Sequence, residues 1–166
     1  MLGGLGDPAL YRYLPDSPPL SLDALADRYR RISTGASADG LDLWCNWIVR
    51  RDADGHCVGV VQATINDVAQ ATGRVLIGYM VLQPFWRMGF GRESVAAMLG
   101  CLFGLYQCRV ADALVDTRNA PSLSLLAGLG FTVVGRIEDA DFFAGATSHE
   151  YELALDNHAW AVRTGS

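Results

Sequence analysis

The sequence of 166 residues contains no lysine, because all 13 of its basic residues are arginine. A phosphate-binding loop of the Walker type needs a lysine, so nucleotide hydrolases of that type are excluded. Enzymes that form a Schiff base with a carbonyl substrate or with pyridoxal phosphate also need a lysine, and they are excluded too. The arginines are scattered along a chain of net charge −5, so we expect no nucleic-acid partner.

Long apolar runs are missing as well. None reaches the roughly 18 residues of a membrane-spanning helix, and residues 1–13 lack the basic and apolar regions of a signal peptide. The four cysteines lack metal-type spacing and the three histidines share no spacing, so we expect no metal site. Reduced, mostly buried thiols in a cytoplasmic protein are the expectation.

Apolar patterns predict an alternation of strands and helices. Strands are expected over residues 43–50, 58–65, 75–82, 110–116, 131–137 and 150–155. Helices are expected after a cap at Ser21, after the glycines of residues 87–92, and from Pro121 to a left-handed cap at Gly130. This order predicts a single α/β domain over residues 1–166, in which helices cover both faces of a mixed sheet.

The turn of residues 87–92 is the most informative segment. Its sequence, Arg-Met-Gly-Phe-Gly-Arg, lies between an apolar strand and the clearest amphipathic helix of the chain. The first N–H groups of a helix have no partner in their own helix, and together with the helix dipole they attract anions. Glycines let a phosphate approach such a backbone closely. The turn therefore predicts a phosphorylated ligand.

Three sequence blocks resemble the GNAT superfamily of acetyl-CoA-dependent N-acetyltransferases, and within it the branch that acetylates the N-termini of ribosomal proteins. The blocks are residues 77–82 with 86–95, residues 115–122 with 129–131, and residues 150–153. The resemblance implies the GNAT fold, with a mostly antiparallel sheet of six to seven strands. It also implies an acyltransferase that moves an acetyl group from acetyl-CoA to a primary amine by direct attack in a ternary complex.

The resemblance assigns residues to acetyl-CoA. The backbone of Met80, Val81 and Leu82 would pair with the pantetheine arm, and Asn119 would bond the same arm. Ser122 would reach toward the thioester sulfur. The pyrophosphate would be held by the N–H groups of the turn, which belong to Arg87, Met88, Gly89, Phe90, Gly91 and Arg92.

Two catalytic roles follow from the same resemblance. Val81 N–H would stabilise the negative charge that develops on the acetyl oxygen. Ser122 would hydrogen-bond the departing thiolate, because Leu126 stands where many family members carry an acidic tyrosine. We expect Tyr79 to be a sheet residue rather than an acid.

Three carboxylates are candidates for the base that takes a proton from the amine. The ribosomal-protein enzymes carry a carboxylate a few residues beyond the strand that follows the glycine cap, and an ungapped count from Phe131 reaches Asp141. A small insertion would select Glu138 or Asp139 instead, and a chain of water molecules is a further alternative. A positioned base contributes roughly 10²–10⁴ in rate.

The N-terminus departs from the family. Members usually have a strand and a helix before the segment of residues 7–14, so the first family strand is expected to be missing here. Either the natural start of the chain lies upstream of Met1, or the sheet has a bare edge that would suit a partner. A homodimer is one possibility. The missing strand also motivates an alternative function, a weak or inactive acyl-CoA-binding regulatory module. The acceptor stays open between a peptide or protein N-terminus and a small-molecule amine.

Overall fold

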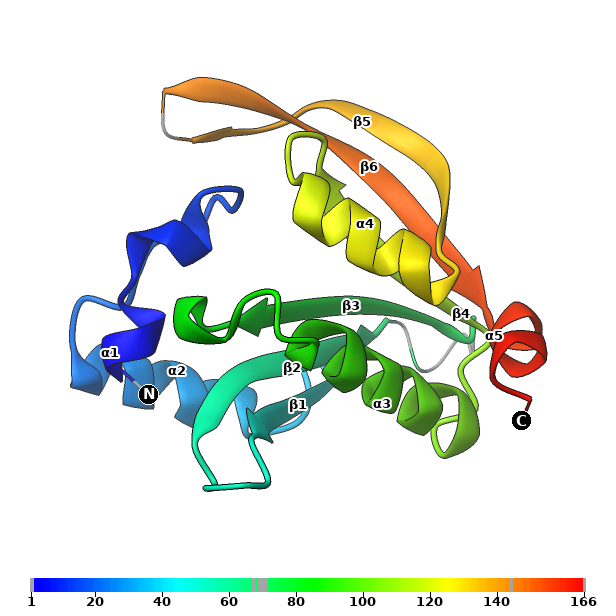
Figure 1. The fold of residues 1–166 in the computed structure, drawn as a ribbon, viewed down its shortest axis with the longest axis horizontal. Coiled ribbons are helices and arrows are strands. Elements are labelled where there is room, and N and C mark those ends of the chain that lie inside the picture. Colours follow the sequence, from blue (N-terminus) through cyan, green and yellow to red (C-terminus); the bar gives the residue numbers. More distant parts are fainter. Residues whose placement is uncertain (1, 67, 69–71, 144, 166) are drawn as a thin grey trace.

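A computed structural model describes residues 2–66, 68, 72–143 and 145–165. The described chain forms a six-stranded sheet with helices on both faces (Figure 1). The strands are β1 (Leu43–Arg50), β2 (Cys57–Ile65), β3 (Arg74–Val81), β4 (Val110–Asp116), β5 (Thr132–Phe143) and β6 (Ala146–Asp156). The helices are α1 (Leu2–Leu5), α2 (Leu22–Ile32), α3 (Phe90–Gly104), α4 (Ala120–Leu129) and α5 (Asn157–Thr164), and the short 3-10 helices are η1 (Pro8–Tyr11) and η3 (Gln83–Phe85).

The strand order of the sheet is β1-β2-β3-β4-β6-β5. β3 and β4 pair in parallel, and the other neighbouring strands pair antiparallel. This is the predicted mixed, mostly antiparallel sheet, and the prediction of fold class is confirmed.

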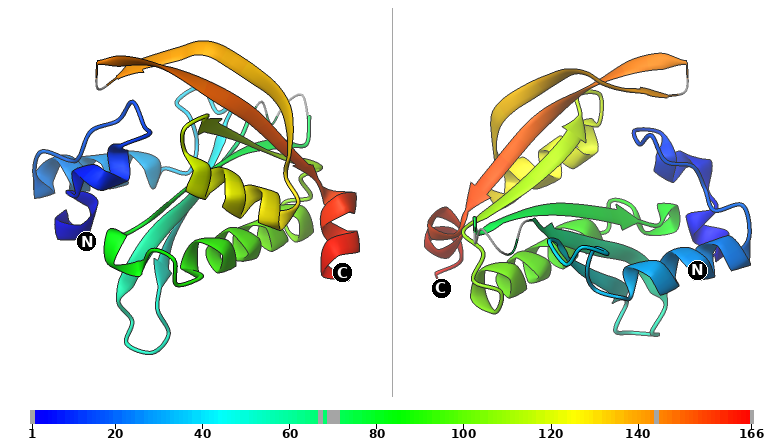
Figure 2. Two further views of the ribbon diagram at one scale, coloured as in Figure 1. Left: turned by 45° about the horizontal axis from the view of Figure 1, so that its top comes forward. Right: turned by 180° about the vertical axis from the view of Figure 1, so that it is seen from behind.

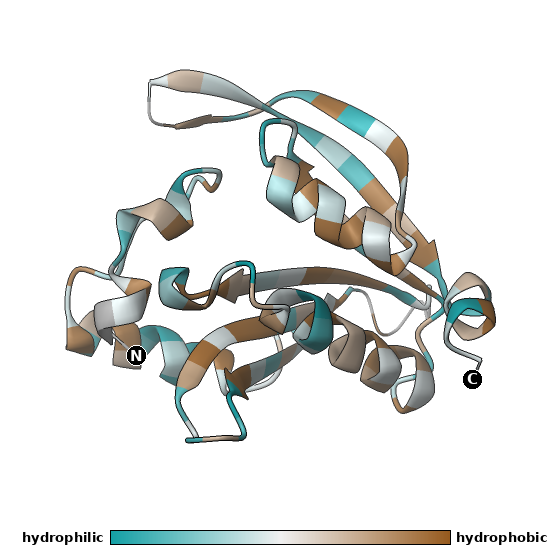
Figure 3. Ribbon diagram, in the orientation of Figure 1, coloured by the Kyte–Doolittle hydropathy of each residue, from teal (hydrophilic) through white to brown (hydrophobic). Residues whose placement is uncertain are grey.

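Two apolar clusters lie on opposite faces of the sheet. The larger cluster joins α3 and α4 to strands β1, β2, β3, β4 and β6 and includes Phe131, just before β5. Both helices lie in front of the sheet in Figure 1. The smaller cluster contains Leu5, Leu25 and Leu82, with Met80 packed against them. It joins α1 and α2 to the other face, where α2 lies in front when the molecule is seen from behind (Figure 2, right). Figure 3 shows the hydropathy of the residues: β2 is largely hydrophobic (brown), and the turn before it is hydrophilic (teal).

The predicted caps form because the sequence supplies the right side chains. Ser21 Oγ accepts a hydrogen bond from Ala24 N–H at 3.1 Å, which begins α2. Gly130 ends α4 with a φ of +103° and donates to the carbonyls of Ala127 and Leu126. Both helix boundaries therefore agree with the sequence-based expectation.

Two elements differ from that expectation. β5 and β6 form a longer ribbon than predicted, and they reach Phe143 and Ala146. The sequence of residues 138–149 hides this ribbon, because it lacks the alternation of apolar and polar residues that marks a half-buried strand. The sequence analysis also missed α5, which Asp156 caps and whose Trp160 ring lies 6.4 Å from that of Phe103. Among the described residues, no helix is long and apolar enough to cross a membrane.

Candidate active site

The two central strands separate along their length. β3 and β4 are paired only where Arg74, Val75 and Leu76 lie beside the first three residues of β4. An ion pair between Arg74 and Asp112 crosses this short seam. Beyond Leu76 the strands diverge into a V, visible in the right view of Figure 2. The edge of β3 that faces β4 is therefore without a strand partner from Ile77 onward, as the resemblance predicted.

Val81 presents its N–H to the open side of the V. The next residue, Leu82, donates its N–H to Val58 O on β2 at 2.9 Å. Successive residues of a strand direct their N–H groups to opposite edges, so Val81 N–H points away from β2 and toward the gap. The Val81 carbonyl accepts a hydrogen bond from the indole of Trp86 at 2.6 Å. Val81 N–H, the predicted donor to an acetyl oxygen, therefore faces the gap.

Leu82 does not fit the role predicted for its backbone. Its N–H is engaged with Val58, and its carbonyl accepts from Phe85 N–H at 2.9 Å. Met80 lies opposite Val60 on β2, in register with it. Of the three residues predicted to pair with pantetheine, only Val81 therefore directs its N–H into the V. Backbone N–H groups along a strand point alternately to its two edges. The pairing register of β3 with β2, which the sequence alone does not determine, decides which of them face the gap.

The glycine turn has the geometry of an anion site. Gly89 precedes α3 with a φ of +90°, and Arg87 is also left-handed at +61°. The first hydrogen bond of the helix runs from Glu93 N–H to Gly89 O at 3.1 Å. It leaves the N–H groups of Phe90, Gly91 and Arg92 without a partner inside the helix. The turn lies directly after the open strand and η3, and Met88 is exposed within it.

Asn119 and Ser122 lie together at the start of α4. Asn119 Oδ1 accepts a hydrogen bond from Ser122 N–H at 3.3 Å, so the side chain caps the helix and its amide N–H₂ remains as a donor. Ser122 Oγ lies 2.7 Å from the hydroxyl of Tyr79 on β3. The two residues thereby bridge the V on the face that α3 and α4 cover. Leu126, one helical turn further on, is completely buried in the core.

Tyr79 is a candidate that the sequence analysis rejected. Its phenol packs against the larger apolar cluster and reaches Ser122, and burial raises its pKa above the ordinary value. A neutral phenol next to a serine hydroxyl can pass a proton toward that hydroxyl. No local pattern in the sequence indicates this contact, because the two residues are 43 positions apart and meet only in the folded chain.

The carboxylates predicted as bases divide into two groups. Glu138 and Asp139 lie at a bulge of β5, where Asp139 has a φ of +52° and the register with β6 shifts. His149 Nδ1 is 2.7 Å from Glu138 Oε2 and 3.7 Å from Asp139 Oδ1. These two carboxylates are largely exposed and already have a partner in this histidine.

Asp141 belongs to a different group, which shares one face of the sheet. It lies opposite Ser148 on β6, and Glu150, two residues on, lies opposite Asp116 on β4. Opposite residues and those two apart on a strand share a face. Leu153 faces the cluster under α4, so this acidic group faces the other way. The acids therefore stand on the face opposite Tyr79 and Ser122, at the wide end of the V.

Glu150 has the environment of a base, although the sequence analysis gave it no catalytic role. Burial raises its pKa, and the negative charges of Asp141 and Asp116 raise it further. Asp116 is buried and ionised: bonds from Arg118 and Ser148 hold its pKa down to about 2. The sequence signal that could have pointed to Glu150 is the alternation of residues 150–155, in which the odd positions Tyr151, Leu153 and Leu155 are apolar and Glu150 is even.

A cavity of about 490 Å³ opens on the same face as these acids, between the N-terminal helices and strands β1 to β3. Met80 and Tyr79 line the end toward the V, and Tyr11, Leu25 and Tyr29 line the wall opposite the sheet. Trp47 also lines it while packing on the larger cluster. An acceptor in this cavity would meet a thioester held from the other face.

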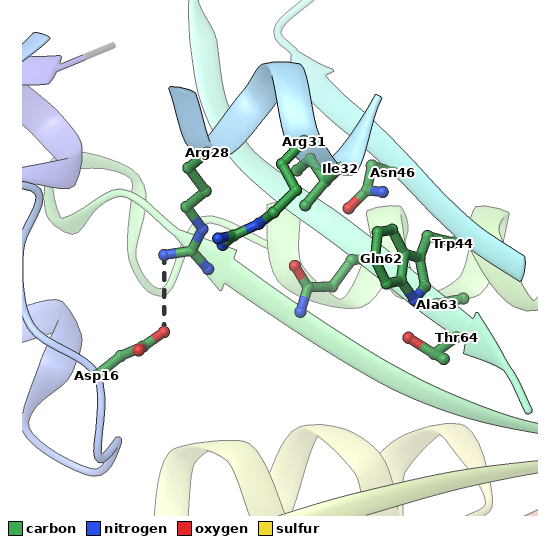
Figure 4. A pocket seen from close by; sticks show the side chains of 9 residues that line it. All are labelled: Asp16, Arg28, Arg31, Ile32, Trp44, Asn46, Gln62, Ala63 and Thr64. Carbon is green, nitrogen blue, oxygen red and sulfur yellow. Dashed lines mark ion pairs between the residues drawn. The ribbon is translucent and has the colours of Figure 1, made fainter. Parts of the chain in front are cut away.

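A second cavity of about 340 Å³ adjoins the first (Figure 4). Both share the lining residues Asp16, Arg28, Ile32, Asn46 and Gln62. The second cavity adds Arg31 from α2 and Trp44 and Thr64 from the sheet. In the part of the chain that the structure describes, no three histidine, cysteine or acidic side chains are grouped as a metal site would require.

Comparison with known proteins identifies the family. Residues 3–132 match the acetyltransferase (GNAT) domain. The uncharacterized N-acetyltransferase p20 of Bacillus licheniformis is 29% identical over 96 residues, which cover 58% of this chain and 54% of that protein. The chain thus matches about half the length of this curated relative.

Solved structures share the fold. The spermidine N-acetyltransferase of Vibrio cholerae, in complex with CoA and spermine, superposes with a TM-score of 0.79 at 16% identity, over 96% of this chain and 89% of that one. A chimera of spermidine N-acetyltransferase from Vibrio cholerae and hSSAT gives a TM-score of 0.75 at 17% identity, over 92% and 88%. The ribosomal-protein branch stays a prediction. The chain belongs to the GNAT family of acetyltransferases, whose acetyl donor is acetyl-CoA, as the sequence blocks predicted.

Proposed function

We propose that the protein is an N-acetyltransferase that moves an acetyl group from acetyl-CoA to a primary amine. The observation that carries this proposal is the V between β3 and β4, whose open edge leads directly into the glycine turn. An extended amide arm finds an unpaired strand edge there, and a pyrophosphate finds free N–H groups a few residues away. The two features fit coenzyme A together, because its two parts are covalently joined.

In the proposed arrangement the residues divide between two faces of the sheet, so that donor and acceptor can be bound at the same time for direct transfer. On the face of α3 and α4, Asn119 would bind pantetheine and the turn of residues 87–92 would bind pyrophosphate. Val81 N–H, in the gap, would stabilise negative charge on the acetyl oxygen. Ser122 would donate a hydrogen bond to the departing thiolate and draw its proton from Tyr79, which lies 2.7 Å away.

The base would act from the opposite face, where the acceptor cavity opens. Asp141 keeps the role that the resemblance gives it. Glu150 is a second candidate, supported by its raised pKa and by its place beside Asp116 at the wide end of the V. A base is needed because an amine attacks only when it is neutral.

A binding experiment and a turnover experiment test the proposal together. Acetyl-CoA at about 100 times its dissociation constant should raise the melting temperature by about 5–10 °C. Addition of an amine should then release a free thiol, detected with a chromogenic disulfide. The absence of any thermal shift with millimolar acetyl-CoA would refute the proposed donor site.

The same assays separate an enzyme from an acyl-CoA-binding regulatory module. Ser122→Ala and Asp141→Asn should both leave the thermal shift by acetyl-CoA in place. In an enzyme, at least the first should lower the rate of thiol release. A regulatory module would show the thermal shift and no thiol release with any amine.

Three further points belong to the proposal: the class of acceptor amine, the cellular location and the oligomeric state. A peptide or protein N-terminus remains a candidate acceptor, and the fold shared with spermidine N-acetyltransferases makes a polyamine another. A cytoplasmic location and a homodimer remain predictions from the sequence. The charges of the acceptor cavity bear on the choice between acceptors.

A further inference from the structure

Two arginines of α2 line the far end of the acceptor cavities. Arg28 and Arg31 are three residues apart, so they lie on the same side of the helix. In Figure 4 the Arg28 side chain extends from α2 toward Asp16, and the Arg31 guanidinium lies beside that of Arg28. Gln62 on β2 lines the same cavity. Two cations held side by side repel each other unless an anion lies between them. Their arrangement therefore favours a negatively charged ligand group.

The charge of the cavity argues against a polyamine. Among the nine residues that line the smaller cavity, Arg28 and Arg31 carry positive charge and Asp16 alone carries negative charge. Asp16 already lies 3.6 Å from Arg28. A polyamine would place several positive charges in a cavity that has one carboxylate, which an arginine already engages. The net charge of the chain, −5, does not describe the local charge here.

Arg31 differs from the other arginines at this end of α2. Arg30 forms an ion pair with Asp27, and Arg28 forms one with Asp16. Within the described chain, the Arg31 guanidinium has neither a hydrogen bond nor an ion pair. Gln62, Asn46 and Thr64 surround the same cavity with neutral hydrogen-bonding groups. A guanidinium with amide and hydroxyl groups nearby matches the needs of a carboxylate or a phosphate.

The arginine end of the cavity is within reach of the reaction centre. Gln62 lies opposite Gly78 in the pairing of β2 with β3. A Cβ on Gly78 would come within 3.2 Å of Gln62 Nε2, so the glutamine side chain lies across this glycine. Val81 follows three residues later, about 10 Å further along the strand. A small molecule can therefore place its amine near Val81 while its other end lies near the arginines.

We propose that the acceptor is a small primary amine that carries an oxyanion, a carboxylate or a phosphate, which Arg31 binds with the help of Arg28 and Gln62. This assignment rests on the proposed acetyltransferase function and narrows its substrate class. The oxyanion orients the acceptor along β3, so that its amine reaches the thioester from the face of the acids.

The test compares matched acceptors in the thiol-release assay. β-Alanine and β-alaninamide differ in one charge, 4-aminobutyrate is longer, 2-aminoethyl phosphate carries the other oxyanion, and spermidine is the polyamine. Wild-type kcat/KM should be at least tenfold higher for one of the oxyanion-bearing amines than for β-alaninamide and spermidine. The carboxylate and phosphate acceptors separate the two possible oxyanions.

Variants of α2 isolate the arginine. Arg31→Gln should lower kcat/KM for the preferred oxyanion acceptor about 10- to 100-fold, mainly through KM, and should leave β-alaninamide unchanged. Each variant is compared with wild type for one acceptor at a time, so differences in amine basicity cancel. Arg30→Gln is the matched control, because Arg30 lies on the same helix, pairs with Asp27 and lines neither cavity. Arg31→Glu should move the preference toward spermidine.

The outcomes distinguish this inference from the proposed function. A wild-type preference for spermidine, or an equal effect of Arg31→Gln on all acceptors, would overturn the inference while acetyl transfer stands. If no amine releases thiol, the proposed function fails. The oxyanion site is then judged by melting temperature: 4-aminobutyrate should stabilise the acetyl-CoA complex, and Arg31→Gln should abolish that shift. The absence of the shift in wild type would contradict the site as well.

Discussion

The contact between Tyr79 and Ser122 places a phenol beside the serine that we propose as the hydrogen-bond donor to the thiolate. A serine hydroxyl is a weak acid, and its ability to serve the thiolate depends on what replaces its proton. Among the described residues, the partly buried Tyr79 phenol is the side-chain hydroxyl in hydrogen-bonding contact with Ser122 Oγ, at 2.7 Å. The family position for an acidic tyrosine holds Leu126, so the phenol comes from a strand instead of a helix.

Removal of either hydroxyl should therefore slow transfer. We expect Tyr79→Phe and Ser122→Ala each to lower kcat about 10- to 100-fold, and the double variant to be little worse than Ser122→Ala, because the two groups act in series. Tyr106→Phe is the control, because Tyr106 follows the C-terminal end of α3, whereas the glycine turn precedes its N-terminal end. Additive losses in the double variant would contradict a shared proton path.

The pH dependence of kcat/KM separates the two candidate bases. The negative charge of Asp141 contributes to the raised pKa of Glu150, so its removal favours ionised Glu150 and lowers that pKa. If Glu150 is the base, Asp141→Asn should shift the acidic limb of the profile to lower pH and preserve the plateau. Glu150→Gln should then lower the plateau about 10²- to 10⁴-fold. The reverse pattern, with the loss in Asp141→Asn, would assign the base to Asp141.

Asp116 serves stability rather than proton transfer. Its pKa of about 2 in the folded protein lies below the ordinary value of 3.8, chiefly because Arg118 hydrogen-bonds the carboxylate. A lowered folded-state pKa stabilises the fold above pH 4, and this stabilisation is lost as the pH falls from about 4 toward 2. We expect Asp116→Asn to cost about 1–3 kcal/mol at pH 7 and less at pH 3, measured by urea unfolding.

Asp52→Asn is the matched control for this measurement, because Asp52 lies in the exposed turn between β1 and β2. Its effect should stay within about 0.5 kcal/mol at both pH values. An Asp116→Asn penalty that is as large at pH 3 as at pH 7 would show that packing, and not charge, determines the loss.

Two glycines, one at the N-cap of α3 and one inside the helix, should respond in opposite ways to replacement by alanine. Gly89 has a φ of +90° at the start, whereas Gly100 lies in the exposed interior of the helix with open space around it. Gly89→Ala should cost about 1 kcal/mol and weaken acetyl-CoA binding, because an alanine resists the left-handed conformation that exposes the turn's N–H groups. Gly100→Ala should stabilise the protein by about 0.5–1 kcal/mol and leave binding unchanged.

Thermal unfolding with and without acetyl-CoA measures both effects. The proposal for the turn requires that the ligand-induced shift shrinks in Gly89→Ala alone. An equal shift in both variants would mean that the backbone conformation at Gly89 does not govern pyrophosphate binding.

Elements with a strong local pattern could be predicted closely from the sequence. β1 and β4 agree with their predicted bounds, and the caps at Ser21 and Gly130 form with the expected donors and acceptors. Local propensity and apolar periodicity determine such elements. The long ribbon of β5 and β6 could not be predicted, because pairing between its two strands sustains it where the sequence lacks alternation.

The candidate site likewise has parts that could be predicted from the sequence and parts that could not. The turn of residues 87–92 was predicted as an anion site from adjacent residues, and the open strand before it was predicted from the family resemblance. Contacts made across the sheet were not: Tyr79 with Ser122, Glu150 with Asp116, and Arg31 with the acceptor cavity. Register decides which side chains share a face, and a shift of one residue reverses the faces. Sequence reasoning without register cannot supply this information.

The complete sheet consists of two parts with a short common border. Strands β1 to β3 pair over long stretches, as do β4, β6 and β5, but β3 and β4 share only three residue pairs. Donor and acceptor reach the V from opposite faces of the molecule in our proposal. The two binding sites would thus meet only at the gap, which would limit direct competition between the two ligands.

The seam at Arg74 and Asp112 lies at the end of the sheet remote from the proposed ligands, where it would act as a hinge between the two half-sheets. A small rotation about this hinge becomes a larger displacement at Val81, because the displacement grows with distance along the diverging strands. Substitutions near Leu76 would then tune donor affinity from about 15 Å away without altering any residue that binds the ligand. The angle between the two half-sheets, rather than the composition of the site, would be the adjustable quantity.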